Sequence, residues 1–142
     1  MAAEPLSAPD ALVAVMIATA AADESISDSE LTWITNTVGH LPVFRGYDHT
    51  RINGVSELVA DDLAREDGLD LLIGRVADAL PDHLRETAYA LACDVAASDG
   101  TVGLSELKLL EMLRHDLSVG RLASAAIERG ARARHMPLAP RA

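Results

Sequence analysis

The sequence has few of the residues that stabilise small secreted proteins or β-sheets. It contains one cysteine, Cys93, which excludes an internal disulfide framework and favours a reducing compartment. Aromatic residues make up only 3% of the 142 residues, whereas apolar residues, with Ala and Leu prominent, make up 49%. Ala and Leu lose little entropy in helices, and no segment shows the apolar–polar alternation of a strand. The composition therefore predicts an all-α protein with one hydrophobic core.

Positive charge is scarce over most of the chain. Residues 1–116 carry 21 acidic and 7 basic side chains, whereas residues 117–142 carry 1 acidic and 5 basic side chains. A body with a net charge of −14 repels phosphate backbones, so we expect no nucleic acid partner, and cations or basic protein surfaces are favoured. The basic end, residues 131–142, is predicted to be a flexible tail, with contact to an anionic surface as the alternative.

The apolar stretch ALVAVMIATAAA, residues 11–22, lacks the features of a targeting segment. A signal peptide requires Lys or Arg before its apolar stretch, and neither residue precedes this one. It is also shorter than the roughly 20 residues that cross a bilayer. We therefore expect a core helix in a soluble, cytoplasmic protein.

Helical periodicity, together with Gly and Pro at the breaks, predicts seven helices in one domain over residues 8–130, after a disordered segment at 1–7. The expected helices cover residues 11–22, 28–38, 50–65, 69–80, 81–98, 104–115 and 118–129, with Ser118 capping the last.

The chain resembles itself at an offset of 76 residues. Residues 11–38 align with 87–114 at seven identical positions, which include Asp23 on Asp99 and Glu30 on Glu106. Apolar positions also align through both segments. An internal duplication of a helix–turn–helix unit, giving a bundle with pseudo-twofold halves, is the simplest explanation.

Each copy carries an acidic turn that leads into a helix. Ser27-Asp28-Ser29-Glu30 has the form of a capping box, in which the Ser and Glu side chains satisfy each other's backbone amides. The second copy has Gly103 at the cap, so only the half of the box made by Glu106 is expected. In this structural interpretation Ile26 and Val102 are buried plugs, and Leu31 faces the core.

The alternative interpretation adds a cation to the same turns. An Asp and a Glu seven residues apart, on either side of a turn, offer the oxygen ligands that Ca²⁺ or Mg²⁺ prefers. The turns are not EF-hand loops, because the twelfth position is Ile34 in one copy and Leu110 in the other, where a bidentate Glu is required. Binding at either turn alone should therefore be weak.

The repeated pattern resembles the tellurite-resistance TerB-like family. The matching residues are Ala-Ala-Asp-x-x-Ile-Ser-x-x-Glu at 21–30 and Ala-x-Asp-Gly-x-Val-x-x-x-Glu at 97–106, and the resemblance covers residues 8–130. It implies an all-helical fold of about seven helices with pseudo-twofold halves. It also implies metal-chelating residues, which would be Asp23, Glu30, Asp99 and Glu106.

The resemblance leads to a functional hypothesis with two alternatives. We expect a non-enzymatic domain that weakly binds Ca²⁺ or Mg²⁺ and contacts a protein partner in a stress response of the metal-resistance type, with a membrane-associated partner left open. Tellurite itself is an oxyanion that this acidic body should repel, so any role in tellurite resistance would be indirect. The alternatives are a structural helical adaptor without metal and, more distantly, a metal-dependent hydrolase.

The remaining candidate residues are isolated. His40 and His49 flank a loop with Asp48, where a transition-metal site is conceivable, but isolated surface histidines are far more common. Cys93 lies on an apolar helix, so a buried, unreactive thiol is expected. No Gly-rich phosphate loop or nucleophile motif is present in the sequence.

Overall fold

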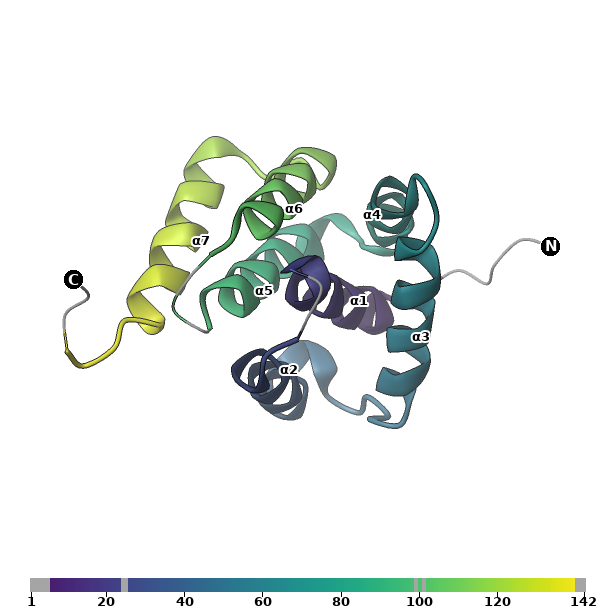
Figure 1. The fold of residues 1–142 in the computed structure, drawn as a ribbon, viewed down its shortest axis with the longest axis horizontal. Coiled ribbons are helices and arrows are strands. Elements are labelled where there is room, and N and C mark those ends of the chain that lie inside the picture. The colour runs from purple at the N-terminus through teal and green to yellow at the C-terminus, as the bar shows by residue number, and fades with distance from the viewer. Residues whose placement is uncertain (1–5, 24–25, 99, 101, 140–142) are drawn as a thin grey trace.

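The computed structural model describes residues 6–23, 26–98, 100 and 102–139, and in these residues it is all-helical without strands (Figure 1). The predicted fold class is confirmed. The α-helices are α1 (Ala8–Ala20), α2 (Asp28–His40), α3 (Arg51–Leu63), α4 (Gly68–Ala79), α5 (Arg85–Ala97), α6 (Leu104–Asp116) and α7 (Arg121–Arg134). Three short 3₁₀ turns are η1 (Ala21–Asp23), η2 (Pro42–Phe44) and η3 (Asp82–Leu84).

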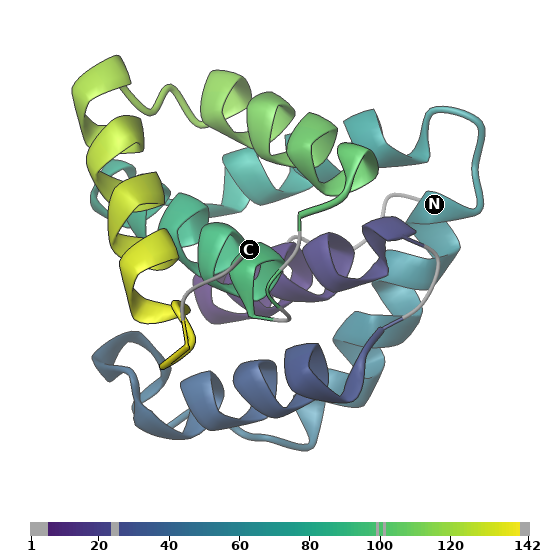
Figure 2. The same cartoon turned by 60° about the vertical axis from the view of Figure 1, so that its left-hand side comes forward.

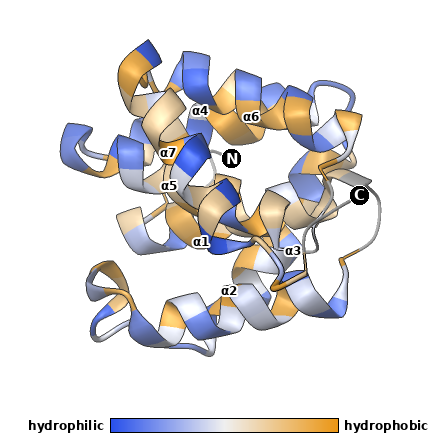
Figure 3. Cartoon of the chain, turned by 90° about the vertical axis from the view of Figure 1, so that its left-hand side faces the viewer, coloured by the Kyte–Doolittle hydropathy of each residue, from blue (hydrophilic) through white to orange (hydrophobic). Residues whose placement is uncertain are grey.

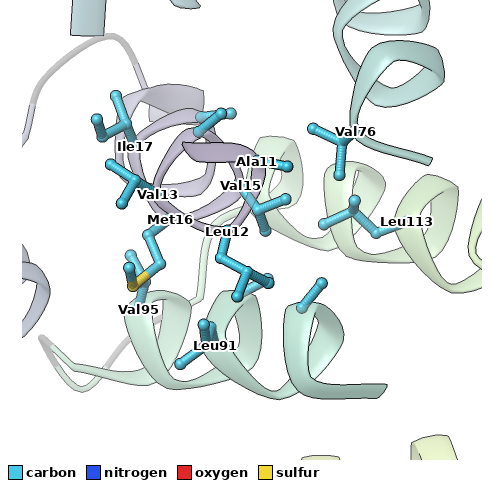
Figure 4. Packing of buried hydrophobic residues seen from close by; sticks show 14 of the residues in the cluster. Ala11, Leu12, Val13, Val15, Met16, Ile17, Val76, Leu91, Val95 and Leu113 are labelled. Carbon is cyan, nitrogen blue, oxygen red and sulfur yellow. The ribbon is translucent and has the colours of Figure 1, made fainter. Parts of the chain in front are cut away.

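Helix α1 is the centre of the hydrophobic core. Every residue from Asp10 to Ala20 is buried, and the helix packs against α2, α3, α4, α5 and α6. Figure 4 shows Leu12 and Met16 directed toward Leu91 and Val95 of α5. A helix that is apolar on all sides has to be surrounded by protein, and this explains its continuous apolar sequence. Among the described residues, no helix is long and apolar enough to span a membrane.

The two predicted repeat units occupy related places in the fold. Helix α2 (28–40) and helix α6 (104–116) have the same length and are separated by the predicted offset of 76 residues. Helices α1 and α5 pack side by side in the middle of the molecule, with α2 against α1 and α6 against α5 (Figure 2). On α6, most hydrophobic residues follow the side that faces the other helices (Figure 3), whereas Leu104 and Leu107 are exposed. Both units therefore bury a central helix behind an outer one.

Buried carboxylates join the helices around this core. Asp10 of α1 accepts hydrogen bonds from the Tyr47 hydroxyl at 2.7 Å and from the Arg51 guanidinium of α3, with which it also forms an ion pair. Asp62 of α3 pairs with Arg75 of α4 at 3.0 Å. Since these acids are almost fully buried, their charge requires such partners.

Gly68 allows α3 and α4 to approach closely. A Cβ atom at this position would lie 1.8 Å from the backbone carbonyl oxygen of Asp62. The backbone of α3 cannot move away without disturbing the Asp62–Arg75 pair, so the crossing requires glycine.

Three local predictions are corrected by the structure. The helix expected from Pro81 begins with the turn η3, and α5 itself begins at Arg85. Ser118 does not cap the last helix: its φ of 55° places it in a left-handed turn, and Gly120 is the N-cap of α7. This helix also passes its predicted end at Arg129 and reaches Arg134, because tertiary contacts described below hold its last turn.

Candidate functional site

The first acidic turn joins α1 to α2 and forms the predicted capping box. The Ser27 hydroxyl accepts a hydrogen bond from the Glu30 amide at 3.1 Å, and Glu30 Oε1 accepts one from the Ser27 amide at 2.8 Å. Glu30 is only 4% exposed although it carries a carboxylate. The box fixes where α2 begins and brings a negative charge to the positive end of the helix dipole.

The second acidic turn joins α5 to α6 and makes half of the same arrangement. Glu106 Oε1 accepts a hydrogen bond from the Gly103 amide at 3.2 Å. Gly103 has no side chain that could accept a hydrogen bond from the Glu106 amide in return. Glu106 is 1% exposed. The predicted difference between the two copies is therefore confirmed, and both glutamates lie in the third position of their helices with the carboxylate turned inward.

The structure brings the two acidic turns near each other through η1. This 3₁₀ turn, which ends at Asp23, packs against α6, and Glu106 is in the first turn of α6. The side chain of Asp23 and the whole of Asp99 lie outside the described residues. Within those residues, no group of three or more His, Cys, Asp or Glu is placed to hold a metal ion. The four-carboxylate metal site thus stays a prediction, of which two members, Glu30 and Glu106, have defined positions.

The apolar residues beside both turns point outward, contrary to the sequence prediction. Ile26 and Val102, expected as buried plugs, are 43% and 41% exposed, and Leu31 and Leu107 are 56% and 50% exposed. For Leu31 and Leu107 the reason is the capping geometry. Because the Glu at the third helical position must turn its carboxylate back to the N-cap amide, the Glu occupies the inner face of the first turn. The next residue is rotated by about 100° and faces solvent.

A pocket of about 550 Å³, not foreseen from the sequence, lies between α5, α6 and α7. Its apolar lining includes Cys93 and Ala96 of α5, Leu110 of α6 and Ala131 of α7. Cys93 is buried as predicted, and burial raises the pKa of its thiol to about 12, so the thiol stays protonated at neutral pH. The pocket combines segments that lie far apart in the chain, and no local pattern could indicate it.

A polar cluster closes the end of α7 against α5 and α2. Asp94 of α5 pairs with Arg134 at 2.7 Å and contacts His135 Nε2 at 3.3 Å. The Trp33 ring of α2 meets the His135 ring edge to face, with centroids 4.6 Å apart. This cluster holds the last turn of α7, a segment that the basic composition predicts as tail.

The histidines near the loop before α3 engage in local contacts. His40 Nδ1 lies 2.7 Å from the Asn36 carbonyl oxygen, and Asp48 accepts hydrogen bonds from the amide and hydroxyl of Thr50. His40, Asp48 and His49 all belong to the described residues, which contain no three-ligand group. The structure therefore offers no support for a transition-metal site there.

A comparison of the chain with models of protein families, with curated proteins and with solved structures found no match. The resemblance to the TerB-like family accordingly remains a prediction that depends on the repeated acidic motif.

Proposed function

We propose that this protein is a non-enzymatic, TerB-like binding domain whose two acidic turns together bind a divalent cation and whose neighbouring apolar residues contact a protein partner. The proposed setting is a stress response of the metal-resistance type. The observation that carries the proposal is that two equivalent turns combine the same two unusual features. Each has a buried glutamate, Glu30 or Glu106, and beside it an exposed apolar pair.

The exposed pairs support the partner contact. The stability of the core does not explain why apolar residues stand at these four positions, because all four are 41–56% exposed. They are Ile26 and Leu31 in one copy and Val102 and Leu107 in the other. A contiguous patch of apolar side chains is typical of protein interaction sites, and the proposal places these four residues in such a surface. Their place next to the turns means that a cation bound there would alter the surface that a partner meets.

The buried glutamates support the cation. Carboxylate oxygens are the ligands that a hard divalent ion prefers, and both turns hold one such group at the same position. Glu30 and Glu106 each use Oε1 for the N-cap amide. In the proposed site the second oxygen of each glutamate, together with Asp23 and Asp99, would provide hard oxygen ligands.

The cation proposal is tested by calorimetric titration of the full chain with Ca²⁺ and with Mg²⁺, and by thermal unfolding in millimolar concentrations of each ion. We expect weak, saturable binding and a higher Tm, because an ion that binds only the folded state stabilises it. The variant Asp23→Asn/Asp99→Asn should lose both effects. The control Asp61→Asn/Asp70→Asn changes the net charge equally at two exposed positions away from the turns and should retain them. Absence of heat and of stabilisation, or equal loss in both variants, would refute the cation site.

A helical adaptor without metal is the competing function, and one observation favours it. The capping bonds of Glu30 and Glu106 already account for one oxygen of each carboxylate without any ligand. Under this alternative, Glu30→Gln/Glu106→Gln would lose about 0.5–2 kcal/mol per cap and show the same thermal response to ions as the unmodified chain.

A further inference from the structure

The pocket between α5, α6 and α7 borders the second acidic turn, since Gly100, Val102 and Leu107 belong to its lining, and it has the size of a small-molecule site. Its volume of about 550 Å³ falls within the range of ligand pockets in proteins. The positions that line it on α5 run from Tyr89 to Ala97 and span about 12 Å along the helix axis. The pocket is thus elongated along α5, with room for a chain of medium length.

The floor of this pocket is apolar. Cys93 and Ala96 come from α5, Leu107 and Leu110 from α6, and Ala131 from α7. The Cys93 thiol is protonated at neutral pH and contributes no charge. A ligand lying on these side chains would remove aliphatic surface from water, which favours a hydrocarbon chain.

One wall of the pocket carries an arginine without an ion-pair partner. Arg114 of α6 is half-buried, as are Arg75 and Arg85. Arg75 pairs with Asp62 at 3.0 Å and Arg85 with Asp82 at 3.7 Å. Within the described residues no carboxylate is close enough to pair with Arg114, although the first 116 residues have a net charge of −14.

Among the charged side chains that line the pocket, Arg114 is the one best placed to bind an anion. Glu128 accepts a hydrogen bond from the Tyr89 hydroxyl at 2.8 Å, and Glu111 is exposed on the same face of α6 as Arg114. Arg132 of α7 adds a second, exposed guanidinium without an ion pair in the described part of the chain. A monoanion suits this setting better than a phosphate, since the two glutamates and the acidic body repel a dianion more strongly.

We propose that this pocket binds an aliphatic carboxylate of medium chain length. The hydrocarbon chain lies on the floor formed by α5, α6 and α7, and the carboxylate accepts paired hydrogen bonds from the Arg114 guanidinium, the geometry that an arginine offers to a carboxylate. The inference does not require a bound cation, because it uses neither of the glutamates at the turns, although the pocket shares Val102 and Leu107 with the proposed partner surface.

The test is a titration of the full chain with decanoate, followed by calorimetry and by the fluorescence of Trp33. Trp33 is the single tryptophan, and its ring contacts that of His135, which lines the pocket. We expect saturable binding of decanoate below the concentration at which it forms micelles. Decanol and decyltrimethylammonium should bind about tenfold more weakly, because neither can accept the charged hydrogen bonds of Arg114.

Variants distinguish the contribution of the carboxylate head group to binding from that of the hydrocarbon chain. Arg114→Gln should weaken decanoate about tenfold and leave decanol unchanged, while Arg114→Lys, which keeps the charge without the planar fork, should fall between. Arg45→Gln removes an exposed arginine outside the pocket and should have no effect. Ala97→Phe, at a half-buried lining position, should abolish binding of both ligands.

Other outcomes would overturn the proposal. These are no saturable binding of decanoate, equal affinity for decanoate and decyltrimethylammonium, tighter binding of decyl phosphate than of decanoate, or equal losses in Arg114→Gln and Arg45→Gln. Circular dichroism of each variant confirms that a loss of binding is not a loss of fold.

Discussion

At the scale of single residues, the acidic turns show how a cap decides which neighbour is buried. Glu30 and Glu106 face inward because their carboxylates reach back to the N-cap amides. On α2 the buried positions that follow are Ile34, Thr37 and Val38, one and two turns further along the same face. Leu31 lies beside this stripe and remains in solvent.

This arrangement predicts a sharp contrast between adjacent apolar residues. Leu31→Ala and Leu107→Ala should each change the free energy of unfolding by no more than about 0.5 kcal/mol, since both side chains are at least half exposed. Ile34→Ala, which removes a side chain that is 3% exposed, should cost about 2–5 kcal/mol. Urea unfolding of the three variants measures both effects. A loss of several kcal/mol in Leu31→Ala would show that this residue is buried after all.

At the scale of helices, the close approach of α3 and α4 depends on a residue without a side chain at one position. Gly68 and Gly74 lie on the same helix, α4, yet their surroundings differ. A Cβ at Gly68 meets the Asp62 backbone, whereas a Cβ at Gly74 meets nothing within 4 Å. The same substitution at the two positions therefore separates helix propensity from packing.

Gly68→Ala should destabilise the protein by about 1–3 kcal/mol, because α3 and α4 must separate to admit the methyl group. Gly74→Ala should stabilise it by about 0.5–1 kcal/mol, because alanine loses less backbone entropy in a helix. Thermal unfolding at constant pH gives the sign of each change directly. Equal effects at the two positions would mean that α3 and α4 do not cross as closely as described.

At the scale of the whole molecule, a few buried charges join helices that the chain separates. Asp10 links α1 to α3 through Arg51 and to the segment before α3 through Tyr47. The Arg51 guanidinium beside Asp10 holds the pKa of that carboxyl below its usual value of 3.8. A carboxyl whose pKa is lower in the folded state adds stability above its unfolded-state pKa and loses it as the pH falls through the folded-state value.

We therefore expect Asp10→Asn to be less stable than the unmodified chain by about 1–3 kcal/mol at neutral pH, the usual effect of removing hydrogen bonds to a charged group. The difference should narrow as the pH falls below 3.8, the usual pKa, toward the lower folded-state pKa at which Asp10 of the folded protein becomes protonated. Denaturant unfolding between pH 7 and pH 2 measures this difference in the free energy of unfolding. The control is Asp61→Asn at an exposed position, for which little change in stability is expected at any pH. A difference that stays constant over this range would assign the loss to packing alone.

The sequence by itself determined the features that arise within a few residues of one another. Periodicity and composition predicted an all-helical chain, and seven α-helices are present in its described part. The Ser27 cap, the incomplete cap at Gly103 and the 76-residue offset between α2 and α6 were also predictable, because each depends on local hydrogen bonds or on repetition.

Only the tertiary structure decided what depends on partners from distant parts of the chain. Asp94 meets Arg134 across 40 residues, and this pair keeps α7 helical beyond the end that composition predicts. The pocket beside Arg114 needs three helices at once. Leu31 and Leu107 are exposed because the glutamate before each of them faces the core. Periodicity alone does not predict this, since a helical repeat gives the spacing of the buried residues but not the side of the helix that faces the core.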